Sequence, residues 1–165
     1  MAVQCFLKIE GPDLPGEAQS EGHEGEIDVL SWSWGVTQSG TMHTGAGGGA
    51  GKANVQDLHI TKHVDSASPN LLQWCCSGKQ FEKATLICRK ASGTDGEHVP
   101  YLTVEMEKLI ITSVQSGGSD GQDIFSESLT LNFGQYKAKY TPQNDDGTAG
   151  SEIEAGWNIR ANEAL

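Results

Sequence analysis

Apolar residues recur at every second position over much of this chain, in short runs separated by stretches rich in glycine, proline and acids. Such alternation is typical of β-strands with one buried face. Seven or more strands and few helices favour an antiparallel sandwich or barrel over βαβ units. The strands are predicted over residues 3–9, 26–36, 54–64, 84–90, 101–114, 126–140 and 153–159.

The stretch from Ile27 to Lys52 joins one of these strands to a glycine tract. In the strand, Ser31 and Ser33 alternate with larger side chains, so we expect the serines to face away from the core. The tract GAGGGAG has no side chain larger than a methyl group and cannot anchor itself against a core. The face opposite the serines carries Leu30, Trp32, Trp34 and Val36.

Two predicted strands change their buried side part-way along. In 101–114 the change falls near Glu107–Lys108, which predicts a bulge, and in 126–140 it falls at Gly134. Bulges and glycine kinks let strands bend to close a barrel. The remaining faces are simpler: Leu58, Ile60 and Val64 share one, and Val3, Cys5, Leu7 and Ile9 share another, opposite Gln4, Phe6 and Lys8.

One helix is predicted, over residues 68–78. Ser68 can cap it, Pro69 suits the first helical position, and Gly78 supplies a left-handed stop. A helix this apolar must be covered by a sheet or by another chain, and we expect it to close one open side of the barrel. Its apolar stripe is Leu71, Leu72, Cys75 and Cys76, with Trp74 beside it. The predicted fold is therefore mainly β: a small antiparallel β-barrel with one α-helix packed alongside.

The chain has 165 residues and 17.6 kDa, which predicts a single domain spanning 1–165. A net charge of −11 argues against a nucleic-acid or membrane-surface partner, because binding phosphate requires clustered Lys and Arg. No run of about 18 apolar residues exists, so no membrane insertion is expected. The N-terminus does not resemble a signal peptide, which predicts synthesis in the cytoplasm and any export without a cleaved signal.

The four cysteines could form disulfides or remain as thiols. The adjacent pair Cys75–Cys76 and the lack of a signal favour buried thiols in a reducing compartment.

The glycine tract is the first candidate for chemistry, as a phosphate loop. Counting back from Gly51-Lys52, Ala46 stands where such a loop needs glycine and Ala53 where it needs a hydroxyl. The residues after the tract are strand-like, so the helix that would face the phosphates is missing as well. Nucleotide binding is therefore excluded.

No other set of residues indicates catalysis or a metal. His59 and His63 are spaced as on a zinc-binding helix, but on a strand they lie about 13 Å apart. The seven carboxylates between Glu10 and Asp28 are scattered, which favours a solvated acidic loop over a calcium site. No nucleophile elbow occurs. We expect no enzyme, catalytic residue, cofactor or metal, and therefore a structural or binding protein.

Several long segments resemble the haemolysin-coregulated protein (Hcp) family, which forms the inner tube of the bacterial type VI secretion system. The resemblance runs from Met1 to about Asn162 and is carried by EIDVLSWSWGVTQSG, GGGAGKANVQDLHITKHVD, SASPNLL, SVQSGGSDGQD, LTLNFGQYKAKYTPQ and GWNIRAN. Cys88 departs from it, since an aliphatic residue is more familiar there.

The resemblance implies a homo-hexameric ring that stacks into a tube, is propelled by a contracting sheath and is secreted. It also implies that the ring carries and chaperones effectors, so the expected partners are further copies, effectors, and sheath and spike proteins. Ser31 and Ser33 are then candidates to face the lumen. Candidates for ring assembly lie in the Gln38–Lys52 segment: Thr41, His43, Gly45, Gly47, Gly48, Gly49 and Lys52.

Two other functions stay open at the level of sequence. A secreted effector with its own hydrolytic activity would need an added domain or a nucleophile–base pair. A phage-type tail tube protein would share the architecture.

Overall fold

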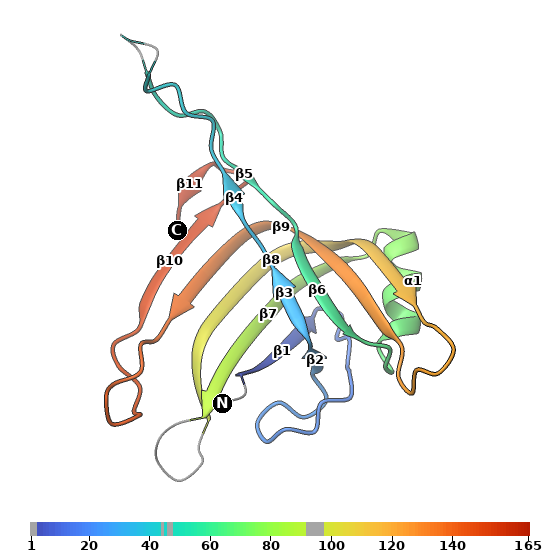
Figure 1. The fold of residues 1–165 in the computed structure, drawn as a ribbon. Coiled ribbons are helices and arrows are strands. Elements are labelled where there is room, and N and C mark those ends of the chain that lie inside the picture. The colour runs from blue at the N-terminus through green and yellow to red at the C-terminus, as the bar shows by residue number, and fades with distance from the viewer. Residues whose placement is uncertain (1–2, 44, 46–47, 92–97) are drawn as a thin grey trace.

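The computed structural model of the chain describes residues 3–43, 45, 48–91 and 98–165, and it shows a mainly β fold (Figure 1). One helix, α1 (Ser68–Ser77), lies in the described part of the chain. The predicted fold class, antiparallel strands with one helix, is confirmed. The strands are β1 (Val3–Glu10), β2 (Ile27–Val29), β3 (Ser31–Ser33), β4 (Val36–Thr37), β5 (Asn54–Val55), β6 (Leu58–His63), β7 (Gln80–Ala91), β8 (His98–Gly117), β9 (Ser126–Tyr140), β10 (Ile153–Asn158) and β11 (Glu163–Ala164).

Nine strands form one curled antiparallel sheet, in the order β2–β1–β7–β8–β9–β10–β11, with β6 pairing to the first part of β9 and also to β3. The curl brings β2 close to β6, and the Leu30 amide donates to the Thr61 carbonyl at 2.8 Å (Figure 1). No ladder joins β2 to β6 among the described residues. The predicted barrel is therefore approached, but it is not closed by strand pairing.

The three long strands bend together at one level of the sheet. In β7, the buried residues change from one side of the strand to the other between Ala84 and Phe81. The residues paired with these two in β8 and β9 show the same change of buried side. Lys108 has a positive φ of 55° there. The predicted switch at Gly134 is confirmed, but the predicted bulge at Glu107–Lys108 is wrong, because the register does not shift at that point. The register of β8 on β9 shifts instead between Ile111 and Ser113.

The core lies inside the curl of the sheet and under α1. Leu71 of the helix is fully buried, with Trp74 and Cys75 partly buried beside it, whereas Leu72 and Cys76 are exposed. The stripe that contacts the sheet is therefore narrower than predicted. The other large core residues come from the strands: Leu7, Ile9, Ile27, Leu58, Ile60, Phe81, Leu86, Met106, Leu109, Leu129 and Leu131.

The start of α1 differs from the prediction. Ala67, not Ser68, occupies the cap position, and no side chain caps the helix. The Ser68 hydroxyl instead donates to Glu127 at 2.6 Å. The left-handed stop is confirmed, since Gly78 has φ 66° and its amide donates to the Cys75 carbonyl.

A buried lysine holds this corner together, and the sequence pattern missed it. Lys62 is fully buried, whereas Val64, which was predicted to face the core, is exposed. The Lys62 ammonium forms an ion pair with the Glu127 carboxylate and a second one, at 2.9 Å, with Asp65. The side chain of Lys62 lies on the same face of β6 as Leu58 and Ile60. The ion pair therefore lies at the edge of the core, next to the N-terminal end of α1.

Two further side chains lie on the side opposite to that expected from alternation. Leu30 and Val36 were predicted to face the core with the tryptophans, but both are exposed. The predicted strand 26–36 is broken into β2, β3 and β4, and the alternation does not hold across the breaks.

Phe6, grouped with polar residues in the sequence pattern, is buried because His23 stacks on its ring at 4.5 Å and Arg89 lies over it.

No helix in the described residues has the length and apolar character needed to cross a bilayer.

Candidate assembly surfaces

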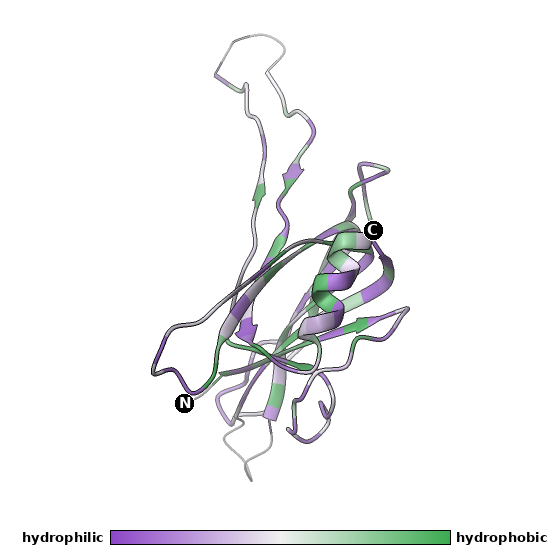
Figure 2. Ribbon diagram, turned by 90° about the vertical axis from the view of Figure 1, so that its right-hand side faces the viewer, coloured by the Kyte–Doolittle hydropathy of each residue, from purple (hydrophilic) through white to green (hydrophobic). Residues whose placement is uncertain are grey.

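A hairpin arm, residues 36–55, projects away from the body of the molecule (Figures 1 and 2). Its two sides pair antiparallel, first as β4 with β5 and then at the bridge between Gly40 and Ala50. Further out, the Thr41 amide donates to the Gly49 carbonyl at 3.1 Å. The described end of the glycine tract, residues 48–51, is therefore one side of a β-hairpin.

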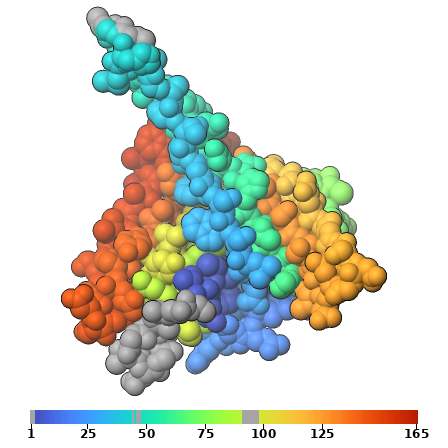
Figure 3. All heavy atoms as spheres, in the orientation of Figure 1, coloured from blue at the N-terminus to red at the C-terminus, as the bar shows by residue number. Residues whose placement is uncertain are grey.

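At its base the arm contacts the body, where Val55 packs against the core, but the described outer part has almost no such contact. The space-filling view shows it standing clear of the other elements (Figure 3). Thr41, Met42, His43, Gly45 and Lys52 are all exposed. An isolated two-stranded hairpin is at best marginally stable in water.

The close spacing of the two sides explains one of the glycines. A Cβ atom on Gly48 would lie 2.8 Å from the Thr41 carbonyl oxygen, closer than side chains can approach backbone. Among the predicted assembly residues, Gly48 and Gly49 are thus part of the arm's own pairing. Gly47 lies outside the described residues, as does Thr44.

Trp34 anchors the base of the arm. Its indole N–H donates to the Gln56 carbonyl at 2.8 Å, which ties the two sides together. The ring packs edge-on against Tyr136, with centroids 4.7 Å apart, and also contacts Phe133. Trp34, predicted to share the face opposite the serines, thus packs against the core.

Ser31 and Ser33 belong to a wider surface of small polar side chains. Both are exposed, and they pair with Thr61 and His59 of β6. Residues paired across a ladder share a face of the sheet, so the surface continues onto β9 and β8. We call it the hydroxyl face after its hydroxyl residues, which are Ser31, Ser33, Thr61, Ser113, Ser128 and the largely buried Thr130. The larger side chains of His59, His63 and Gln115 lie on the same side of the sheet.

Hydrogen bonds fix the β8–β9 part of this face. Thr130 bonds the Ser113 hydroxyl at 2.6 Å and the Thr112 hydroxyl at 2.7 Å. Thr112 also donates to Asp57 at 2.7 Å, and Asn132 donates to the same carboxylate at 2.8 Å. The sequence reasoning missed these residues because only strand register brings them next to Ser31 and Ser33.

A basic groove of about 450 Å³ lies at the base of the arm. Lys52, Lys108 and Arg160 line it together with Phe133 and Ile110, and no carboxylate is among its lining residues. None of the three cations forms an ion pair within the described part of the chain. The groove is therefore a positive region on a protein of net charge −11.

The acidic loop between β1 and β2 is folded, not simply solvated as predicted. Leu14 and Ala18 are buried, and the Gly16 amide donates to the Gly25 carbonyl at 2.8 Å. The His23 ring is hydrogen-bonded to the Glu26 carboxylate. The loop remains the most acidic segment of the chain, with carboxylates along its outer side.

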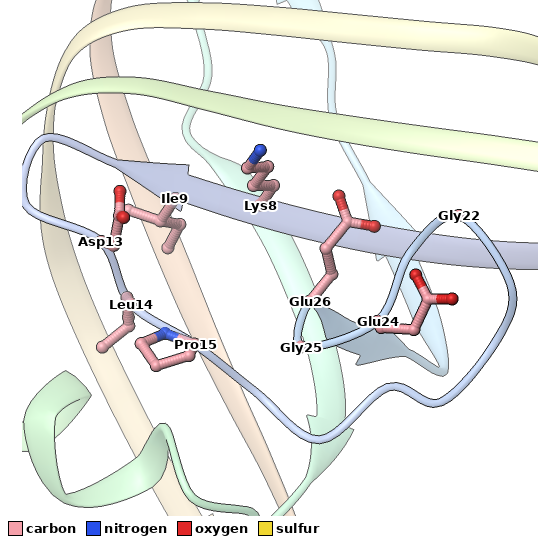
Figure 4. A pocket seen from close by; sticks show the side chains of 9 residues that line it. All are labelled: Lys8, Ile9, Asp13, Leu14, Pro15, Gly22, Glu24, Gly25 and Glu26. Carbon is pink, nitrogen blue, oxygen red and sulfur yellow. The ribbon is translucent and has the colours of Figure 1, made fainter.

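A hollow of about 200 Å³ separates this loop from β1. Figure 4 shows Asp13, Glu24 and Glu26 on the loop side, across from Lys8 and Ile9. Backbone hydrogen bonds, chiefly within Glu24 itself and from Gly22, hold the pKa of the Glu24 carboxyl below its usual value. The hollow thus keeps a negative rim at neutral pH.

The candidate metal ligands do not come together. His59 and His63 are exposed on β6, and the described residues contain no group of three or more His, Cys, Asp or Glu side chains able to hold a metal ion. The structure therefore offers four candidate contact surfaces: the arm, the hydroxyl face, the basic groove and the acidic loop.

Comparisons with known proteins agree on one family. The family model described as "Type VI secretion system effector, Hcp" matches residues 6–140. Protein hcp1 of Pseudomonas aeruginosa is 49% identical over 163 residues, which is 98% of each chain.

Solved structures give the same result. The crystal structure of Hcp1 from Salmonella typhimurium has a TM-score of 0.80 at 37% identity and covers 100% of both chains. A structure described as a type six secretion system protein has a TM-score of 0.90 at 27% identity, and it covers 99% of this chain and 100% of the other.

Proposed function

Because this chain belongs to the Hcp family of the type VI secretion system, we propose that it is the structural subunit of an inner tube built from stacked hexameric rings. In this proposal residues 1–165 act as one tube domain without catalytic activity. The protein leaves the cell together with the effectors that the ring carries, and its apparatus partners are the sheath and spike.

The hairpin arm is the observation that carries the proposal. Met42 is 78% exposed, and Val36 is exposed as well. Apolar side chains left in water on a projecting arm are typical of a surface that another protein covers. A second copy that covers the arm removes these side chains from water and supplies the anchorage that the glycine tract lacks. Thr41, His43, Gly45, Gly48, Gly49 and Lys52 are then contact residues between subunits or rings.

The charges favour a head-to-tail arrangement of rings. β5 and the end of β10, which border the basic groove, lie at the end of the molecule that bears the arm, and the acidic loop lies at the opposite end (Figure 1). In this proposal the acidic loop of one ring docks at the basic groove of the next. Such a contact joins two different surfaces, does not close on itself, and can propagate into a tube.

The hydroxyl face is the proposed lumen wall. Its small side chains leave room for cargo and present donors and acceptors without charge. Effectors of different sequence can bond to such a surface, which suits a carrier better than a deep, shape-specific pocket.

Light scattering after size-exclusion chromatography tests the ring directly. The purified chain should elute with a mass near six copies. A monomer at micromolar concentration in moderate salt would remove the main support for the proposal.

A further inference from the structure

Cys5 and Cys88 face each other across two paired strands. Cys5 of β1 is the register partner of Cys88 of β7, and their sulfur atoms lie 2.8 Å apart. Directly paired residues of antiparallel strands have Cα atoms about 4.5–5.5 Å apart, which falls within the range that a disulfide spans. The two thiols can therefore be joined without moving the backbone.

We propose that Cys5 and Cys88 form a built-in oxidation site, which closes to an intrachain disulfide when the protein meets a small-molecule disulfide outside the reducing compartment. The biological setting rests on the proposed function, since it requires that the chain leave the cell. The chemistry itself rests on the geometry of the pair.

The two thiols have different environments, and this sets their roles. Cys88 is fully buried, whereas Cys5 is partly exposed at the edge of the same core. The hydrogen bond with Cys88 lowers the pKa of Cys5, although burial opposes it. The same bond, together with burial, raises the pKa of Cys88. Cys5 is therefore the thiol that reacts first, as the thiolate.

The reaction proceeds by two exchanges. The Cys5 thiolate attacks one sulfur of the small disulfide, whose other half leaves as a thiolate and takes up a proton. Cys88 then loses its proton and attacks the Cys5 sulfur of the mixed disulfide, releasing the second small thiol. The protein loses two hydrogen atoms, and one molecule of small disulfide is reduced to two thiols.

The new bond would join positions 83 residues apart in sequence. A cross-link over so long a loop restricts the unfolded chain strongly, so the oxidised protein should unfold about 10 °C higher than the reduced protein. The bond ties β1 to β7 near the β2 end of the sheet. An exported subunit would thus gain stability after assembly, without needing the bond in order to fold.

The test uses the full-length purified protein and oxidised glutathione. Intact mass should fall by two hydrogen atoms, a non-reducing peptide map should link the Cys5 peptide to the Cys88 peptide, and dithiothreitol should reverse both changes. A Cys75→Ser/Cys76→Ser variant is the matched control and should behave like the wild type.

One further variant separates the possible outcomes. Cys88→Val should stay folded and stop at a glutathione adduct on Cys5, with no rise in melting temperature. A wild-type protein that keeps such an adduct, remains unreacted at Cys5, or cross-links through Cys75 or Cys76 would overturn the proposal. Because these measurements do not depend on oligomeric mass, their failure is distinguishable from failure of the ring.

Discussion

At the scale of single residues, Lys62 and Glu127 form the one ion pair in the described part of the chain whose two side chains are both fully buried. Burial alone raises the pKa of the Glu127 carboxyl, but hydrogen bonds from Lys62, Ser68 and Ser116, with the charge of Lys62, outweigh it and place the pKa below its usual value. Removing one partner of a buried ion pair leaves the other charge buried and unpaired. The pair joins β6, β9 and the start of α1.

We therefore expect Lys62→Met to lower the free energy of unfolding by about 3–5 kcal/mol, measured by urea denaturation at pH 7. Lys62→Met combined with Glu127→Leu should recover a large part of that loss. The exposed pair Lys137–Glu154, at 3.1 Å, is the matched control, and Lys137→Met should cost less than about 1 kcal/mol. Equal losses for the two single variants would contradict the assignment.

The same pair predicts a pH dependence. A carboxyl whose folded pKa is depressed contributes stability above its unfolded pKa, about 4.3, and that contribution is lost as the pH falls through the folded value. The wild type should therefore lose stability below about pH 4.3 more steeply than the Lys62→Met/Glu127→Leu variant. Urea midpoints between pH 7 and pH 3 measure the difference, and parallel curves would contradict it.

A substitution at Ser33 tests whether the hydroxyl face contacts cargo. Because it is exposed on the hydroxyl face, Ser33→Trp should fill the proposed lumen while leaving ring mass and unfolding midpoint unchanged. Retention of a bound effector, measured by co-purification, should fall about tenfold, which corresponds to about 1.4 kcal/mol. Gln73→Trp, on an exposed position of α1 away from the hydroxyl face, is the control. Unchanged retention would remove Ser33 from the lumen.

At the scale of elements, the proposed function gives the arm and the body separate tasks. The body contains the long ladders β7–β8–β9 and the core, whereas the arm contributes short pairings and no buried apolar residue in its described part. Stability of the fold and stability of the assembly should therefore respond to different changes.

Deleting Thr44–Gly49 should abolish rings and tubes while the free energy of unfolding stays within about 0.5 kcal/mol of the wild type, because surface changes away from the core cost little. Light scattering and urea denaturation measure the two effects on one sample. Met42→Ser is a milder variant that keeps the length of the arm and should weaken assembly partially. Normal rings after the deletion would contradict the role of the arm.

At the scale of the whole molecule, the distribution of charge matters more than its total. The acidic loop and the basic groove lie at opposite ends of a chain whose net charge is −11. Copies that approach head to tail bring opposite charges together, and copies in any other orientation mostly repel each other.

Arg160→Glu should therefore reduce stacking of rings without changing the mass of a single ring, and Glu24→Lys in the same chain should restore it. Sedimentation velocity and electron microscopy at low and high salt measure the stacks. Lys79→Glu, an exposed position outside the groove lining, is the control of equal charge change. If Glu24→Lys does not restore stacking, the acidic loop is not the surface that docks at the basic groove.

The sequence by itself determined the features that depend on near neighbours along the chain. Alternation located the long strands, Pro69 and Gly78 bounded the helix, and Gly134 marked where β9 changes face. These features are local, because strand and helix periodicity and backbone sterics act over a few residues. Long segments of unusual sequence were also enough to indicate the family.

Only the tertiary structure decided which side chains meet. Lys62 looks like an interruption in a strand until Glu127, 65 residues away, is placed beside it, and Cys5 and Cys88 look unrelated until β1 pairs with β7. The hydroxyl face likewise needs the register of four strands. Cross-strand register depends on packing between distant segments, and alternation along one strand does not specify it.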